Sequence, residues 1–195
     1  MPHLMRAFRS ASVLALLAAV GCAEDLTPPA AVEAPLAPVA ADASHASPGH
    51  AAASSTPAVR AWLRDLRRAT APYRRFRNAV AAGYGTAITG CMESDAGGMG
   101  FHYGDPTRLD DVVEPLRPEL LLYVPGPGGD LRFVAVEYAV PFTAWSAPHP
   151  PEIAGVPFHR NETFGLWILH AWVGQSNPAG ILMDWNPTVS CRWAH

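Results

Sequence analysis

The sequence predicts an α+β domain in which N-terminal helices pack on an antiparallel β-sheet or small open barrel. Two observations support this fold class. Apolar residues recur at helical spacing after residue 57, whereas short apolar runs separated by Gly and Pro follow residue 84, which is typical of strands and turns. Strands and helices do not alternate beyond that point, so a parallel sheet is not expected.

The helical segment is expected to begin at Thr56-Pro57, because Thr is a favoured N-cap and Pro a favoured first helical residue. Pro72 should divide it into two helices, and Gly83 should end it. The apolar face consists of Val59, Leu63, Leu66, Tyr73, Phe76 and Val80. The opposite face is either solvated or touches anionic headgroups. Its basic residues are Arg60, Arg64, Arg67, Arg68, Arg74, Arg75 and Arg77.

Four strands are expected, near residues 99–103, 119–124, 131–140 and 165–173, with PGPGGD as the hairpin loop between the second and the third. Alternation in the third strand places Leu131, Phe133, Ala135 and Glu137 on one face. In the fourth strand both faces are apolar apart from His170, so this strand should be buried on both sides. The residues on the same face as His170 are Leu166, Ile168 and Trp172.

The first 22 residues resemble a bacterial lipoprotein signal peptide. Arg6 and Arg9 precede the apolar run ASVLALLAAV, which is shorter than the roughly 20 residues that span a bilayer. Gly21-Cys22 matches the end of the lipobox, with Ala19 where leucine is usual. The resemblance implies cleavage before Cys22 and diacylglyceryl modification of its sulfur. An ordinary secretory signal with a chance cysteine is the alternative.

Three regions follow from this interpretation. Residues 1–21 are the signal peptide, residues 22–57 are the lipidated Cys22 and a disordered Ala/Pro-rich tether, and residues 58–195 are one globular domain. We expect a lipoprotein of the bacterial cell envelope that faces the periplasm or the exterior, with the membrane as a partner through the Cys22 lipid. The net charge of -3 argues against nucleic acid as the main partner.

The number of cysteines is consistent with an exported protein. If lipid takes Cys22, then Cys91 and Cys191 remain, and an oxidising compartment makes a disulfide between them the expected state. The alternative is that one of the two is a nucleophile or a metal thiolate, but the sequence has no C-x-x-C motif.

Polar residues inside apolar strands indicate a candidate metal site. His102, Glu137 and His170 come from three different expected strands, and two histidines with a carboxylate suit Zn, Cu, Fe or Mn. His159, in PFHR, is a possible fourth ligand. The alternatives are a structural pair of Glu137 with either His102 or His170, and acid–base chemistry without a metal.

The sequence leaves open whether the protein is an enzyme, because it lacks G-x-S-x-G, H-E-x-x-H and P-loop motifs. Glycine-rich DAGGMG precedes a strand rather than a helix, so it indicates a tight loop and not a phosphate cradle. Aromatic residues suggest a second function, a non-catalytic small-ligand pocket lined by Trp172, Trp185 and Tyr138. A purely structural envelope protein is the third possibility.

The region from about residue 70 to 191 is similar to uncharacterised secreted bacterial proteins. The phrases that carry the similarity are GGMGFHY (97–103), VEY (136–138), LHAW (169–172) and NPAG, DWNP and Cys within 177–191. The resemblance implies one self-contained exported domain and carries over no catalytic role.

Overall fold

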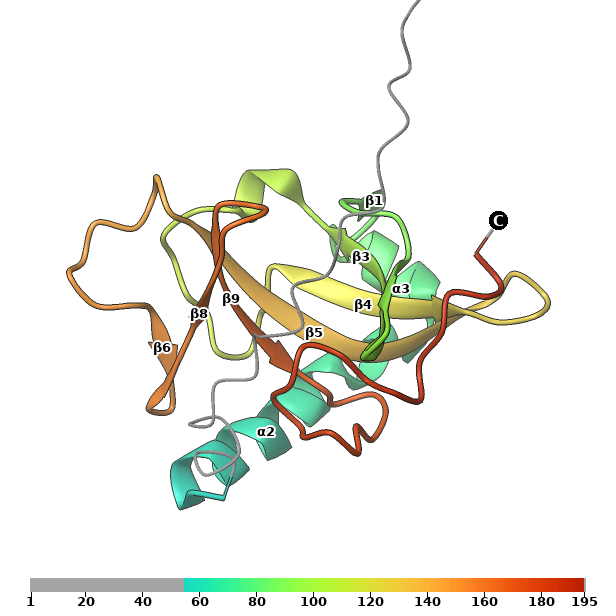
Figure 1. Cartoon of the computed structure of the whole chain (residues 1–195), viewed down its shortest axis with the longest axis horizontal. Coiled ribbons are helices and arrows are strands. Elements are labelled where there is room, and N and C mark those ends of the chain that lie inside the picture. The colour runs from blue at the N-terminus through green and yellow to red at the C-terminus, as the bar shows by residue number, and fades with distance from the viewer. Residues whose placement is uncertain (1–54, 195) are drawn as a thin grey trace, which may run out of the picture. The chain divides into compact units, whose positions relative to one another are not determined.

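The computed structural model describes residues 55–194, and its centre is an antiparallel sheet with helices on one face (Figure 1). The sheet order is β1-β3-β4-β5-β9-β8, with β2 paired to β3 outside this path. The α+β class predicted from the sequence is therefore confirmed. The strands of this sheet are β1 Thr86–Ala87, β2 Met92–Ser94, β3 Gly97–Gly104, β4 Leu120–Pro125, β5 Leu131–Pro141, β8 His159–Asn161 and β9 Leu166–Ala171. A separate hairpin consists of β6 Glu152–Ile153 and β7 Val156–Pro157.

Several expectations concern residues that lie outside the described range. The signal peptide, the lipidation site Cys22 and nearly all of the tether belong to residues 1–54. Between residues 55 and 194, the structure has no helix whose length and apolar content would allow it to cross a membrane.

The helical segment begins and divides as predicted. Helix α2 spans Pro57–Thr70, and the Thr56 side chain accepts a hydrogen bond from the Val59 backbone N–H at 3.2 Å. Pro72 lies in the 3₁₀ turn η1 (Ala71–Arg74), after which α3 spans Phe76–Ala81. Val80 is 46% exposed, contrary to the prediction, and Ala79 is buried instead. The backbone of Arg75 is extended (φ -100°, ψ 108°) and separates η1 from α3, so the helical periodicity of α2 does not continue into α3.

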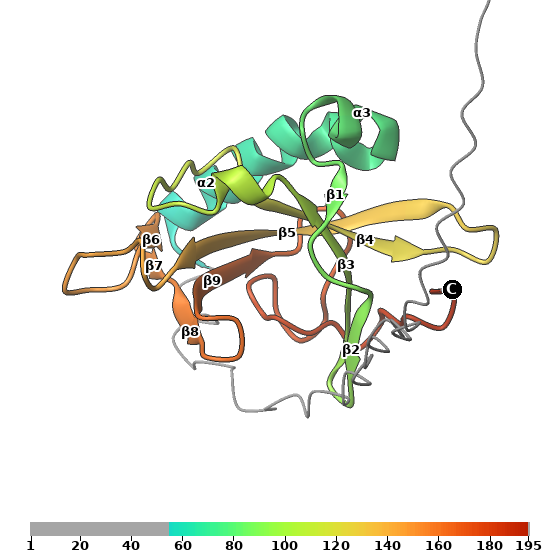
Figure 2. The ribbon, with the colours of Figure 1, turned by 90° about the horizontal axis from the view of Figure 1, so that it is seen from above.

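The sheet lies between two covers (Figure 2). On one face, the helix-side cluster joins α2 to the sheet through Val59, Trp62, Leu63, Leu66, Leu121, Tyr123, Val136, Tyr138 and Leu169. On the other face, the C-terminal strap, which we define as residues 174–191, covers the strap-side cluster. That cluster includes Leu120, Leu122, Val134, Ala135, Ala139, Ile168, Trp172 and Val189. The central strands are thus buried on both sides, as expected for the strand around His170.

A β-bulge in β5 overturns one sequence prediction. Leu122 pairs with Ala135 but Tyr123 pairs with Phe133, so Val134 is an extra residue in the ladder. Phe133 consequently packs in the helix-side cluster and Ala135 in the strap-side cluster, although simple alternation places them together. The bulge turns Glu137 toward the strap and away from the helices.

Two of the contacts that hold the strap lie at β2 and β3. The predicted disulfide is present, with Cys91 just before β2 joined to Cys191 at the end of the strap (S–S 2.02 Å). At the start of β3, Gly98 and Asn186 exchange two backbone hydrogen bonds of 3.1 Å. Gly97, with φ of +118°, leaves no room for a Cβ atom, which would lie 2.2 Å from the Asn186 carbonyl oxygen. DAGGMG is therefore where the strap docks onto β3.

Candidate metal centre

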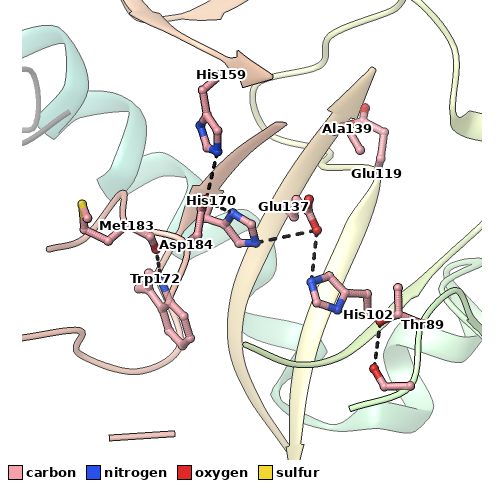
Figure 3. A network of polar contacts seen from close by, with 11 residues as sticks. Thr89, His102, Glu119, Glu137, Ala139, His159, His170, Trp172, Met183 and Asp184 are labelled. Carbon is pink, nitrogen blue, oxygen red and sulfur yellow. Dashed lines mark hydrogen bonds and ion pairs between the residues drawn. The ribbon is translucent and has the colours of Figure 1, made fainter. Parts of the chain in front are cut away.

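Three strands bring His102, Glu137 and His170 together on the strap side of the sheet (Figure 3). His102 belongs to β3, Glu137 to β5 and His170 to β9. Glu137 and His170 are directly paired in the β5–β9 register. His102 lies beyond the intervening strand β4, opposite Leu122, and its ring reaches Glu137 over that strand. The three residues that the sequence suggested as one constellation therefore lie together.

The separations between the three side chains suit one metal ion. The Glu137 Oε2 atom lies 3.2 Å from His102 Nε2 and 3.7 Å from His170 Nε2. One possible ligand atom from each residue lies within 4.8 Å of the other two. Two ligands at about 2.1 Å from a tetrahedral ion are separated by about 3.4 Å, so small side-chain adjustments would close the site around an ion. This group of residues could hold a metal ion.

Hydrogen bonds orient both imidazoles with the Nε2 atom toward Glu137. His170 Nδ1 lies 2.9 Å from Asp184 Oδ1, where it can only donate to the carboxylate. His102 Nδ1 lies 2.9 Å from Thr89 Oγ1, and that hydroxyl donates its own hydrogen to the Gly90 carbonyl oxygen at 2.9 Å. The Thr89 hydroxyl therefore accepts from His102 Nδ1. In the neutral form of each histidine, the Nε2 lone pair faces Glu137, and three acceptors meet with no hydrogen between them.

His170 Nε2 is the atom that most needs a partner. It is buried and makes no hydrogen bond within the described chain, and its only contact with Glu137 is at 3.7 Å. A buried polar atom without a partner costs about 1–3 kcal/mol, so natural proteins rarely keep one without a reason. A proton or a metal ion at this position would satisfy both His170 and Glu137.

The electrostatics of the cluster favour a cation among its carboxylates. Burial by itself raises the pKa of Glu137, but the His170 charge and the 3.2 Å contact with His102 outweigh burial and hold that pKa below its usual range. Burial lowers the pKa of His170, but Glu137 and Asp184 outweigh it, and the net pKa is raised. Asp184 is likewise buried, yet His170 and His159 lower its pKa. Two ionised carboxylates thus enclose one positive charge.

Asp184 is a residue of the cluster that sequence reasoning missed, and its position corrects the role expected of His159. The two oxygens of Asp184 each contact one histidine, His170 Nδ1 and His159 Nε2, both at 2.9 Å. His159 is therefore joined to the cluster through Asp184 and is not a fourth ligand. The prediction failed because it placed His159 beside the ion, whereas the strap inserts Asp184 between them. The motif DWNP (184–187) is typical of a turn, and its sequence does not indicate that Asp184 contacts a histidine.

The candidate site is sealed from solvent. His102 is 2% exposed, Glu137 5% and His170 1%. Trp172, also on the strap side, is 2% exposed and donates from Nε1 to the Met183 carbonyl oxygen at 2.6 Å, which ties it to the strap. Solvent and substrates thus have no direct approach to the cluster in this conformation.

The aromatic pocket predicted from Trp172, Trp185 and Tyr138 does not form. Tyr138 is buried in the helix-side cluster, where its hydroxyl donates to the Pro115 carbonyl oxygen at 2.6 Å. Trp172 and Trp185 belong to the strap-side cluster. Successive residues of a strand point to opposite faces, so Tyr138 cannot share a wall with the partners of Glu137.

A shallow hollow of about 300 Å³ lies beside Trp172, at the start of the strap. It is lined by Arg67, Val173, Gly174, Gln175, Ser176, Asn177 and Ile181 in addition to Trp172. The side chains of Gln175 and Asn177 are already engaged, with Thr188 and with the Trp185 carbonyl oxygen respectively. The polar groups needed to orient a small ligand are thus largely occupied.

Comparison with known proteins gives no relative from which a role could be transferred, since no family model, no curated protein and no solved structure matches the chain. The role of the cluster is therefore inferred from its own chemistry.

Proposed function

We propose that this protein binds one divalent transition-metal ion through His102 Nε2, the Glu137 carboxylate and His170 Nε2. The observation that carries the proposal is the buried His170 Nε2 atom, which faces Glu137 without a hydrogen bond. A divalent ion would supply that atom with a partner and would balance the charges of Glu137 and Asp184 with all three histidines neutral. Metal and proton would thus compete for the same place.

The chemistry of the three ligands limits which metal ions are expected to bind. Two imidazoles and one carboxylate suit Zn, Cu, Fe or Mn, whereas Mg and Ca prefer sites made only of oxygen. Burial of all three ligands favours a resident ion over a hydrolytic centre, because catalytic zinc sites keep a coordination position open to water or substrate. We infer a role in holding the ion, or in exchanging electrons through it.

Metal analysis tests this proposal. The protein, isolated without an affinity tag, is expected to contain close to one equivalent of a single transition metal by mass spectrometry. His102→Gln, Glu137→Gln and His170→Gln should each reduce the content several-fold. His149→Gln is the matched control, because His149 is exposed and lies outside the cluster. A wild-type protein that holds none of Zn, Cu, Fe or Mn, both as isolated and after refolding with each ion, would leave these residues as a structural network.

We also propose that the protein is an exported lipoprotein of the bacterial cell envelope. The lipobox-like sequence at Cys22 and the Cys91–Cys191 disulfide, which suits an oxidising compartment, support this. Labelling with an alkynyl fatty acid should mark the wild-type chain and not Cys22→Ser. Equal labelling of both chains would contradict lipidation at this residue.

A further inference from the structure

Positive charge is concentrated in the helical segment. Between Pro57 and Ala81 the chain has seven arginines and one acidic residue, Asp65, a net charge of +6. Residues 82–194 have five arginines and twelve acidic residues, a net charge of -7. All seven arginines of the helical segment are exposed. The domain therefore has strongly opposed charges on its helices and on the remainder of the chain.

Helix α2 arranges four of these arginines in a stripe opposite its apolar face. They recur at intervals of three, four or one residue, which places them side by side along the helix, whereas Val59, Leu63 and Leu66 are buried. Arg67, at one margin of this row, also lines the hollow beside Trp172. We call Arg60, Arg64, Arg67 and Arg68 the arginine stripe. Figure 2 shows α2 and α3 together on one side of the sheet, with the strap on the other.

The stripe is only partly neutralised by its neighbours. Asp65 contacts both Arg64 at 3.4 Å and Arg68 at 3.0 Å, so one carboxylate serves two guanidinium groups. Arg60 donates to the neutral backbone carbonyl of Ser55. Four positive charges thus face a single negative one along about 12 Å of helix.

We infer that the arginine stripe docks this domain on a bilayer surface that contains anionic phospholipid. Guanidinium groups bind phosphate in a bidentate geometry, and each basic residue near an anionic membrane contributes about 1 kcal/mol, or roughly fivefold in affinity. Val80, an exposed apolar residue of α3, belongs to the same helical segment. This inference does not depend on the metal or on a lipid at Cys22.

The charge of the remaining chain sets the orientation. An anionic surface attracts the helices at +6 and repels residues 82–194 at -7, so the helices face the bilayer. The strap and the metal centre then face away from it. A protein of uniform charge would have no such preferred orientation.

Vesicle binding by the full-length chain with Cys22→Ser tests the inference without a lipid anchor. The probes are phosphatidylcholine vesicles with and without 30% phosphatidylglycerol, at low salt. We expect the anionic vesicles to bind far more tightly, and Arg60→Gln/Arg64→Gln/Arg67→Gln/Arg68→Gln to weaken that binding by a few hundred-fold, at roughly fivefold for each arginine. Salt at 0.5 M should abolish the difference between the two vesicle types.

A charge-matched variant is the control. Arg117→Gln/Arg132→Gln/Arg160→Gln/Arg192→Gln removes four exposed arginines elsewhere in the domain and should change vesicle binding less than tenfold. An equal loss in both variants would show that net charge alone is responsible and would overturn the inference. Equal binding to neutral and anionic vesicles would also overturn it, as would tighter binding to a short DNA duplex than to anionic vesicles.

Discussion

His170 lies within the otherwise apolar run LWILHAWVG because each of its two ring nitrogens has a carboxylate beside it. Asp184 accepts from Nδ1, and Glu137 faces Nε2. Without these carboxylates, a buried imidazole in an apolar strand would lose its hydration with nothing in return. The histidine is thus part of a charged cluster built by three strands and the strap.

Asp184 should tune the metal centre without being a ligand. Asp184→Asn keeps an acceptor for His170 Nδ1 but removes a charge, so we expect metal affinity to fall by about 10- to 100-fold with the binding stoichiometry unchanged. Competition with a chromophoric chelator that is present while the protein refolds measures this affinity. His159→Gln, which can still donate to Asp184, should have a smaller effect, and an unchanged affinity in Asp184→Asn would exclude this tuning role.

Glu119 should make stability depend on pH. Its side chain is 3% exposed and accepts from the Ala139 backbone N–H at 3.1 Å. Burial raises the pKa of this carboxyl from 4.5 to about 7, despite the opposing effects of that hydrogen bond and of Arg108. The folded protein therefore binds more protons than the unfolded chain between these two values. The stabilisation is complete below pH 4.5 and is lost as pH rises through 7.

Glu119→Gln preserves the acceptor for Ala139 and removes the ionisation. We expect it to have a free energy of unfolding higher than wild type by up to about 3 kcal/mol at pH 8, and similar to wild type near pH 4.5. Urea unfolding of both proteins across this range provides the measurement. A difference that does not vary with pH would show that Glu119 ionises as freely when folded as when unfolded.

Among the strands, apolar runs with turn residues on both sides predicted β3, β4, β5 and β9 to within two residues at each end. Burial of β9 on both sides was predictable because both of its faces are apolar apart from His170. The bulge at Val134 was not, since it arises from pairing with β4 and not from any residue type in β5. The short strands β1, β2 and β8 likewise depend on a longer neighbour for their hydrogen bonds.

The part of the site that lies in the strands could be predicted from the sequence, and the part that lies in the strap could not. His102, Glu137 and His170 stand out as polar residues inside apolar strands, where only a partner or an ion offsets the loss of hydration. Asp184 lies in an irregular segment, where polar residues are ordinary. Its partnership with His170 exists only after the strap has folded back over the sheet.

Docking of the strap against β3 should be sensitive to a single methyl group. Gly97→Ala would place a Cβ 2.2 Å from the Asn186 carbonyl oxygen at a φ of +118°, and we expect a loss of more than about 3 kcal/mol of stability. Gly129 is the matched control, because its φ is +78° and nothing lies within 4 Å of the corresponding Cβ position.

Gly129→Ala should therefore cost only the strain of the backbone, about 1 kcal/mol. Thermal and urea unfolding of the two variants separate the effect of backbone conformation from that of close packing. Equal losses in both would mean that the strap can move away from β3 at no cost.

The whole domain depends on one covalent link between its beginning and its end. The disulfide closes a loop of 100 residues, and loops of that length contribute up to about 4.7 kcal/mol in the chain-entropy account. We expect Cys91→Ser/Cys191→Ser to lower the free energy of unfolding by about 3–5 kcal/mol in urea. Cys22→Ser should have no effect, and a similar loss in that variant would contradict the assignment.

The sealed position of the proposed metal ligands also has a consequence for biogenesis. An ion held by this cluster would enter most readily before the strap has folded over His170, while the chain is folding and the disulfide is still open. The compartment in which the strap closes then selects the metal by what it supplies there, rather than by the order of intrinsic affinities. Once the strap has closed, the protein would retain that ion even when ions that bind more tightly are present. The bound ion would then be set by the compartment in which the protein folded.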